Sequence, residues 1–330
     1  MRNPLRLSVL IQIAFLLMVS SPGWAAGFKY MRAGNAQDVQ THPTAGTALM
    51  GGGSDLDAAF KWLCEKADGG DFLILRARGD DSYNPYVQKL CPLNSVATLI
   101  VGNRRTAQDA RVAKIIRSAE AVFIAGGDQA RYVHYWQGTP VETAINEDIA
   151  AGKPIGGTSA GLAILGQFSF GALINTTTSP QALKNPYDRH VTLVKAFLVV
   201  PHMENVITDS HWVARDRLGR TLVFLARIMQ DGWATRPLGI PIDEKAAVLV
   251  EASGQGTVVG QGAAYFLRPT HPPEQCVRKQ KLTFTGIEAY RAPVGSHFDL
   301  AEWQGDGGVK YELNVKDGIV SGTLAGGKLY

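Results

Sequence analysis

Short apolar segments alternate with helix-like segments over the first half of the chain, and this alternation constrains the fold more than any other feature. Helices are expected at 107–118, at 142–150 and from a capping box of Ser54 and Asp57 to about residue 66. The apolar segments lie at 48–51, 72–77, 96–101, 121–125 and 154–157. Short strands that alternate with helices are typical of a parallel sheet covered on both faces. The sequence therefore predicts an α/β fold with a doubly wound parallel sheet.

The pattern changes beyond about residue 240. Apolar segments separated by Gly and Pro turns predict further strands at 246–251, 257–259, 263–267, 281–284 and 309–315. Periodicity leaves two arrangements open, antiparallel edge strands of the same domain or a small appended β unit. We favour a single domain over residues 26–330 with a β-rich extension from about 246, because no linker-like stretch separates these segments. Residues 27–45 are expected to lead into the domain.

The first 25 residues have the features of a secretory signal peptide. Arg2 and Arg6 precede an apolar run at 7–19, and small residues precede a predicted cut after Ala25. The alternative is an uncleaved membrane anchor, but the apolar run is shorter than the roughly 20 residues of a membrane span. We therefore expect an exported protein, periplasmic or secreted, without a stable membrane anchor.

Composition and charge fit a globular protein, with 330 residues of which 45% are hydrophobic and 19% are charged. Loss of Arg2 and Arg6 with the leader would reduce the formal charge from +4 to +2, which gives no electrostatic basis for binding nucleic acid. Cys64, Cys91 and Cys276 allow one disulfide after export, and we expect Cys64–Cys91, although sequence alone does not fix the pairing. Neither Cys-x-x-Cys nor His-Glu-x-x-His occurs, so no metal and no cofactor are expected.

Residues 157–161 read Gly-Thr-Ser-Ala-Gly and match the nucleophile elbow Gly-x-Ser-x-Gly. In this motif small residues let a strand turn sharply into a helix, so that the serine hydroxyl projects from the end of the strand. An apolar strand precedes Ser159, and a helix is expected over residues 162–165. The alternative interpretation is a structural turn. We interpret Ser159 as a nucleophile.

Residues 126–129, Gly-Gly-Asp-Gln, follow the preceding predicted strand. Because the carboxyl ends of parallel strands line one crevice, this loop is expected to face Ser159. The backbone N–H groups of Gly127, Asp128 and Ala160 are candidates for an oxyanion hole, in which each donor contributes roughly 3 kcal/mol to stabilising the transition state. A tight turn without chemistry is the alternative.

A nucleophilic serine needs a base, and His211 lies in the most suitable setting of the seven histidines. The same segment carries Arg215, Arg217 and Arg220, and guanidinium groups bind carboxylates in a bidentate manner. These arginines are therefore candidate substrate contacts. The alternative is a solvated helix face with internal ion pairs.

Three sequence blocks, 126–129, 157–161 and 209–220, together resemble the signature of cyanophycinases, serine peptidases related to the alpha-aspartyl dipeptidases. The resemblance extends over about residues 47–259. It implies a parallel α/β sandwich like that of glutamine amidotransferases, with Ser159 as nucleophile and His211 as base. The same match implies substrate contacts from Gln129, Asp209, Arg215, Arg217 and Arg220. The family releases β-Asp-Arg from cyanophycin, a poly-aspartate that carries arginine on each side chain, so the resemblance implies a serine-type exopeptidase acting on such a peptide or isopeptide substrate. Family members often pair, which suggests a homodimer.

The sequence departs from the family pattern at three places. Residues 160–184 contain no acid, where the family usually supplies the third member of the triad, so Asp188, Glu204 or another residue must take this role, or none does. Ser210 replaces the usual Gln before the base, and Leu162 stands where Ala is common. Two other interpretations therefore remain beside a cyanophycinase-like enzyme. One is a dipeptidase or other acyl hydrolase with a different substrate, and the other is a non-catalytic binding protein on the same scaffold.

Overall fold

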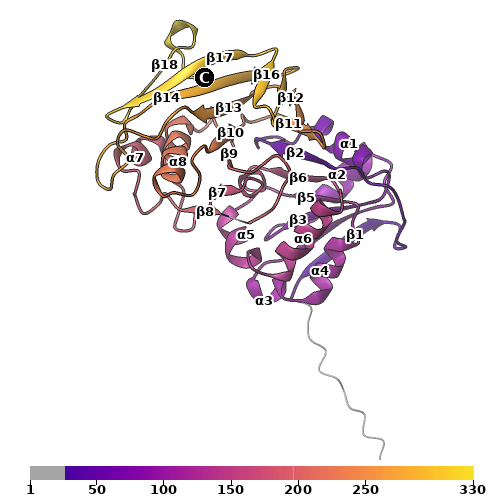
Figure 1. The fold of residues 1–330 in the computed structure, drawn as a ribbon. Coiled ribbons are helices and arrows are strands. Elements are labelled where there is room, and N and C mark those ends of the chain that lie inside the picture. The colour runs from indigo at the N-terminus through magenta and orange to yellow at the C-terminus, as the bar shows by residue number, and fades with distance from the viewer. Residues whose placement is uncertain (1–26, 196) are drawn as a thin grey trace, which may run out of the picture.

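The computed structural model describes residues 27–195 and 197–330, which form a mixed α/β structure built on two large sheets (Figure 1). Within these residues the larger sheet has ten strands, and its five central strands run parallel. In spatial order they are β1 (Lys29–Gly34), β4 (Ser95–Ile100), β3 (Asp71–Arg76), β5 (Ala121–Ile124), β6 (Ile155–Thr158), β2 (Gly46–Met50), β11 (Ala246–Glu251), β12 (Gln255–Gly260), β15 (His297–Asp299) and β16 (Gln304–Asp306).

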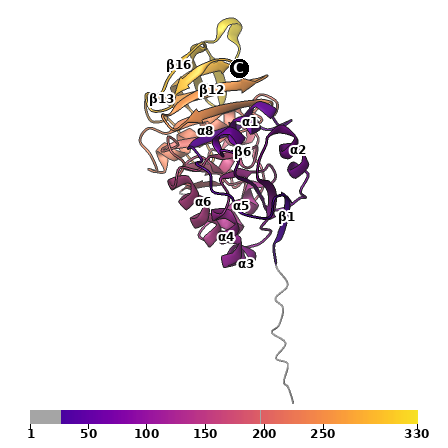
Figure 2. The ribbon, with the colours of Figure 1, turned by 90° about the vertical axis from the view of Figure 1, so that its right-hand side faces the viewer.

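Helices cover both faces of the parallel strands (Figure 2). Successive side chains of a strand point to opposite faces, so on β3 Phe72 and Ile74 pack on one side and Leu73 and Leu75 on the other. The first side is covered by α1 (Asp57–Lys66) and α2 (Tyr83–Leu90). The second side is covered by α3 (Arg104–Ala107), α4 (Ala110–Arg117), α5 (Gln129–Trp136) and α6 (Pro140–Ala150).

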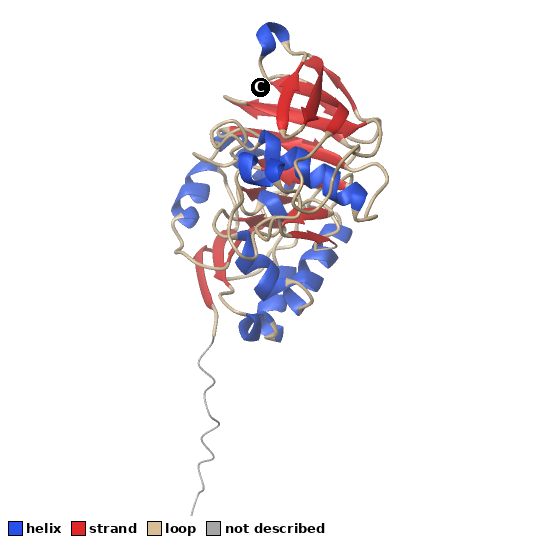
Figure 3. Ribbon diagram, turned by 90° about the vertical axis from the view of Figure 1, so that its left-hand side faces the viewer, coloured by secondary structure: helices blue, strands red, loops and turns tan. Residues whose placement is uncertain are grey.

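The second sheet has eight strands within the described ranges and packs one face on α7 (Ser179–Lys184) and α8 (Leu218–Gln230) (Figure 3). In spatial order its strands are β18 (Ile319–Gly322), β17 (Val309–Lys316), β14 (Phe284–Pro293), β13 (Ala263–Pro269), β10 (Leu238–Pro241), β9 (Val206–Asp209), β7 (Phe168–Phe170) and β8 (Leu193–Lys195). On its opposite face, Ile240 and Phe266 share a core with Val248 of the larger sheet. This shared core holds the carboxyl ends of strands from both sheets together.

The predicted strands of the first half are confirmed, but several other local predictions were wrong. Residues 27–45 include β1, which pairs with β4. The Ser54 capping box does not form, because Leu56 is the N-cap of α1 and no side chain caps this helix. The helix expected at 107–118 is divided into α3 and α4, since Asn103 and Asp109 each cap a new helix. The strand expected at 281–284 begins at Phe284, as β14.

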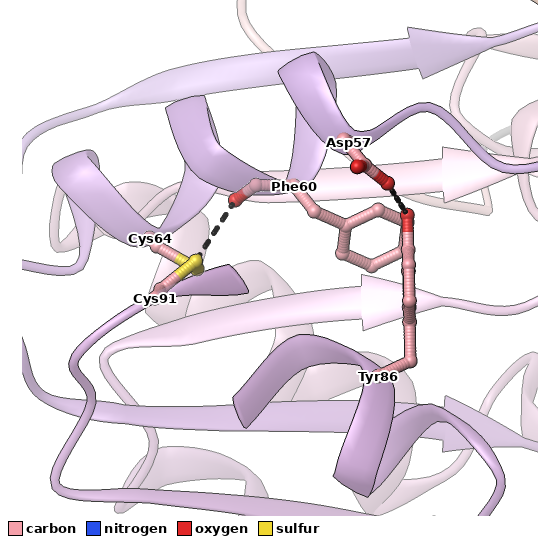
Figure 4. The surroundings of a disulfide bond; sticks show 5 residues. All are labelled: Asp57, Phe60, Cys64, Tyr86 and Cys91. Atoms are coloured by element: carbon pink, nitrogen blue, oxygen red, sulfur yellow. Dashed lines mark hydrogen bonds between the residues drawn. A yellow bond between two sulfur atoms is a disulfide. The ribbon is translucent and has the colours of Figure 1, made fainter. Parts of the chain in front are cut away.

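The Cys64–Cys91 disulfide predicted from the sequence is confirmed (Figure 4). It joins the last turn of α1 to the residue that follows α2. The same two helices are linked by Tyr86, whose hydroxyl donates to Asp57 at 2.7 Å. Cys276 is a buried free thiol. Of the helices that the structure describes, none combines the length and apolar character needed to cross a membrane.

Candidate active site

Ser159 follows β6 in a tight turn and has a positive φ of 52°. Both glycines of the elbow are needed, because a Cβ at Gly157 would lie 2.7 Å from the carbonyl carbon of Gly161, and a Cβ at Gly161 would collide with the carbonyl oxygen of Ile124. The helix expected at 162–165 is only a short 3-10 turn, Leu162–Ile164. The chain instead passes on to β7 of the second sheet.

His211 and Glu244 approach the serine from the second sheet. His211 follows β9, and its Nε2 lies 2.7 Å from Ser159 Oγ. Glu244 follows β10, and its Oε1 lies 2.6 Å from His211 Nδ1. His211 has a positive φ of 50°, as Ser159 does. The three side chains therefore form a continuous serine–histidine–carboxylate relay, built from strand ends of both sheets.

The backbone at residues 50–52, at the end of β2, positions the segments that carry this relay. The carbonyl oxygens of residues 50, 51 and 52 accept hydrogen bonds from the backbone N–H groups of Ser159, His211 and Lys245 at 3.1, 2.8 and 2.9 Å, respectively. Gly52 has a φ of +94°, and a Cβ there would lie 2.5 Å from His211 Cε1. A side chain at this position would displace the imidazole.

Glu244 occupies the position for which the sequence suggested Asp188 or Glu204, and neither of those residues contacts His211. Asp188 lies 2.8 Å from His190 Nδ1 and accepts from Gln181 at 3.0 Å. Glu204 is exposed. The expectation failed because the carboxylate comes from a separate strand, and the only available signal was a pair of acids at 243–244 just after a short apolar segment.

The loop at 126–128 faces the serine. A Cβ placed at Gly126 would lie 3.6 Å from Ser159 Cβ. The Tyr132 hydroxyl donates to the carbonyl of Ala125 at 2.7 Å and so anchors the start of the loop. Within the part of the chain that the structure describes, the N–H groups of Gly127 and Ala160 make no hydrogen bond. Both are therefore free to bind an oxyanion.

A cavity of about 530 Å³ opens beside this loop. Its wall combines apolar residues, among them Leu173 and the 58% exposed Ile174, with cationic residues. Lining residues predicted from the sequence as site residues are Gly127, Asp128, Gln129, Arg215, Arg217 and Arg220. Among the described residues, no group of three or more His, Cys, Asp or Glu side chains is placed to hold a metal ion.

Comparison with known proteins agrees with this geometry. The sequence model of peptidase family S51 matches residues 83–255, more than half of the chain, and this segment contains Ser159, His211 and Glu244. The chain belongs to peptidase family S51. The family match ends at residue 255, and all of β13–β18 lies beyond it.

This S51 family member is similar to several cyanophycinases. It is 29% identical to the cyanophycinase of Synechococcus elongatus over 178 residues, 54% of this chain and 50% of the relative. It is 27% identical to the cyanophycinase of Trichormus variabilis over 210 residues, 62% of this chain and 65% of the relative. The matches thus span half to somewhat less than two thirds of those proteins. A crystal structure of a peptidase from an acI-B1 Actinobacterium shares the fold, with a TM-score of 0.51 and 18% identity over 68% of this chain and 91% of that one.

Asp209 has a different position from the one that the resemblance implied. It is fully buried, and its carboxylate accepts from Arg220 Nε at 2.9 Å and Nη2 at 2.5 Å and from the Thr221 hydroxyl at 3.0 Å. Burial alone would raise the pKa of Asp209, but the charges of Arg220 and Arg217 hold it below its ordinary value. Asp209 therefore positions the arginines and does not face the cavity.

Arg220 and Arg217 differ in how closely they bind the Asp209 carboxylate. Arg220 also donates to Thr176 Oγ1 at 3.2 Å, so most of its guanidinium is bound within the protein. Arg217 reaches Asp209 only at 3.4 Å and donates to the Ser210 carbonyl at 2.8 Å. Burial lowers the pKa of Arg217 to about 10, which still leaves it charged at neutral pH. Arg217 and the exposed Arg215 are the cations available to a ligand.

Replacing Asp209 by Ala should destabilise this peptidase by about 3–5 kcal/mol, because it leaves the buried Arg220 charge without a partner. Urea unfolding followed by circular dichroism measures the change. The control is Asp317→Ala, which breaks an exposed ion pair with Lys281 and should change the free energy of unfolding by less than about 1 kcal/mol. Equal effects of the two substitutions would contradict the buried-pair assignment.

His211 is suited to accept a proton because its pKa is lowered. Burial is the main cause, and the charges of Arg215 and Arg217 lower the pKa further, against the opposing effect of Glu244. A base acts in its neutral form, so reactivity is lost only as the pH falls through this lowered pKa. The acid limb of the pH profile, where reactivity falls as the pH is lowered, is therefore expected below about 6.5, the ordinary pKa of histidine.

Arg215→Gln should raise the pKa of His211 and move the acid limb upward by roughly half a pH unit, since it removes a nearby positive charge. The rate at which a fluorophosphonate labels Ser159, measured from pH 4 to 8, reports this without any need for substrate binding. Arg268→Gln makes the same charge change in the remote Arg268–Glu288 pair and should leave the limb in place. A shift toward lower pH in the Arg215 variant would refute the electrostatic argument.

Proposed function

We propose that the protein hydrolyses aspartyl peptide or isopeptide bonds with Ser159 as nucleophile. The observation that carries the proposal is the pair of short hydrogen bonds that joins Ser159 to His211 and His211 to Glu244. Family membership supports a serine-type peptidase, and the cationic cavity beside the serine supports a substrate with a carboxylate next to the scissile bond.

The proposed reaction follows from the positions of these groups. Ser159 Oγ attacks the carbonyl carbon while its proton passes to His211 Nε2, and the negative charge that forms on the carbonyl oxygen is bound by the N–H groups of Gly127 and Ala160. His211 then gives the proton to the leaving nitrogen, and the C–N bond breaks. Water attacks the acyl-enzyme in a second cycle, again through His211. Glu244 holds the imidazole so that Nδ1 carries its proton and Nε2 is free to accept one.

Similarity to cyanophycinases makes cyanophycin, with β-Asp-Arg as product, the first substrate to test. One observation favours a second candidate, a dipeptidase or other acyl hydrolase. Ser210 stands where the family usually has Gln, is buried, and accepts from Arg217 at 3.2 Å, so it faces the arginine and not the cavity. This departure from the family pattern, next to an arginine that lines the cavity, favours a substrate other than cyanophycin.

Incubation of the purified protein with cyanophycin and, separately, with short Asp-X peptides tests both candidates. Release of β-Asp-Arg supports a cyanophycinase, whereas hydrolysis of the peptides alone supports the second candidate. A protein that hydrolyses neither, and whose Ser159 is not labelled by a fluorophosphonate, would be a non-catalytic binding protein and would refute the proposal.

We also propose that the protein is exported and that residues 26–330 are a single domain of glutamine-amidotransferase-like arrangement with an additional β-rich part. The predicted signal peptide, residues 1–25, lies outside the described residues, and the Cys64–Cys91 disulfide supports an oxidising compartment. Mass spectrometry of protein recovered outside the cytoplasm should find an N-terminus at Ala26. Recovery of the intact chain from the cytoplasm would contradict export.

A further inference from the structure

A second cavity, of about 370 Å³, lies at the same loop as the first. It is lined by residues 76–79 after β3, by the loop at 126–128, and by Arg131 and Tyr132 of α5. The two cavities share Gly127 and Asp128 and have no other lining residue in common. Gly126 of this cavity lies against Ser159, and neither Arg215 nor Arg217 lines it, so the second cavity lies beside the Ser159 turn and carries arginines other than those of the first.

The lining of the second cavity is cationic. Arg76, Arg78 and Arg131 contribute three positive charges, and Asp128 is the one carboxylate among the lining residues. Arg76 is held in place by the carbonyl oxygens of Arg78 at 2.8 Å and Asp80 at 3.0 Å, partners that orient the guanidinium without neutralising it. The cavity thus presents fixed positive charge beside the catalytic loop.

The carboxylates that pair with these arginines would compete only weakly with a ligand carboxylate. Asp80 is 3.8 Å from Arg76 and 74% exposed, and Asp128 is 3.4 Å from Arg131 and 52% exposed. Long, exposed pairs of this kind contribute little to stability. Within the described ranges, Arg78 makes no ion pair. Asp55 is half-buried and interacts with Arg76, and its burial raises the pKa of its carboxyl against the opposing charge of Arg76.

We propose that this cavity is a second carboxylate subsite, so that the substrate is an acidic chain with carboxylates on both sides of the scissile bond. The inference rests on the proposed hydrolysis at Ser159, whose other flank carries Arg215 and Arg217. A guanidinium-bearing residue in the second cavity would meet three like charges. The site therefore favours a chain of free aspartates or glutamates over one whose carboxylates carry arginine.

Binding to the Ser159→Ala protein tests the subsite without relying on turnover. Isothermal titration would compare tetra-aspartate with Asp-Asp-Asn-Asn, Asn-Asn-Asp-Asp and Asp-Asp-Arg-Arg. Tetra-aspartate should bind about tenfold more tightly than either half-neutral peptide, and the arginine peptide should bind most weakly, because charge-assisted contacts are lost on one flank in each case. Equal binding of tetra-aspartate and either half-neutral peptide would overturn the proposal.

The double variant Arg78→Gln/Arg131→Gln, made in the Ser159→Ala protein, locates the effect. In this variant, tetra-aspartate should bind only about twofold more tightly than one of the half-neutral peptides. The ratio of its affinity to that of the other half-neutral peptide should be unchanged. Arg215→Gln should leave the first affinity ratio unchanged and lower the second. Arg268→Gln, a substitution remote from both cavities, should change neither ratio. If Arg268→Gln lowered the affinity ratios equally, binding would depend only on the net charge of the protein. That result would also overturn the proposed subsite. Fluorophosphonate labelling of the wild-type protein tests hydrolysis separately, so failure of the two proposals can be distinguished.

Discussion

Ser159→Ala should abolish hydrolysis, with a loss in kcat of about 10⁶-fold, comparable to what removal of the nucleophile causes in other serine peptidases. The hydroxyl is the only group of the relay that forms a bond to the substrate. The alanine lacks the Oγ that lies 2.7 Å from His211 Nε2 and otherwise fits the same positive φ of the elbow as the serine does. Product release, followed by chromatography, measures the loss.

The fold of this variant should be intact, because the turn depends on Gly157 and Gly161 and on the Ser159 backbone N–H, which donates to Met50. Thermal unfolding should therefore occur within a few degrees of the wild-type temperature. Fluorophosphonate labelling should disappear. A labelled alanine variant, or one that retains wild-type turnover, would place the nucleophile elsewhere.

Glu244→Gln should lower kcat by roughly 10⁴-fold, the loss seen when the carboxylate of a serine–histidine–acid relay is replaced by its amide. The carboxylate accepts the Nδ1 proton of His211 at 2.6 Å and so keeps Nε2 free for the serine proton. An amide can donate to Nδ1 instead, which favours the tautomer with the proton on Nε2. Because Glu244 raises the pKa of His211, its loss should also move the acid limb of the labelling rate to lower pH.

Asp188→Asn and Glu204→Gln are matched controls for this prediction. Each removes one carboxylate, but Asp188 is bonded to His190 and Gln181, and Glu204 is exposed. Both variants should keep kcat within about twofold of wild type. A large loss in either of them, with Glu244→Gln unaffected, would show that the relay of the active protein uses a different acid.

Local sequence signals predicted the parts of the fold that depend on neighbours in the chain. The apolar runs at β2 to β6 predict strands because a buried parallel strand has a continuous apolar sequence. The elbow at 157–161 has a local sequence signal because its glycines are required by contacts within the turn and with the adjacent strand. Local signals predict no helix at 83–90 or 218–230, although both helices pack apolar faces in the structure.

Longer-range features were predicted less well, and Asp209 shows why. Its place in the third sequence block suggested a substrate contact, but burial beside Arg220 gives it a structural role. The cationic cavity at residues 76–79 and 131 had no sequence signal, since its arginines come from two separate segments. Only packing of the turn after β3 against α5 brings them together.

The sequence by itself predicted Ser159 as the candidate nucleophile on a strand-to-helix elbow, together with a facing glycine loop and a cationic segment with His211. The tertiary structure decided which carboxylate completes the relay and which arginines face a ligand. The physical reason is that Glu244 lies at the end of β10 in the second sheet and Ser159 at the end of β6 in the first. Their distance is set by how two sheets share a core, and no local pattern encodes that packing.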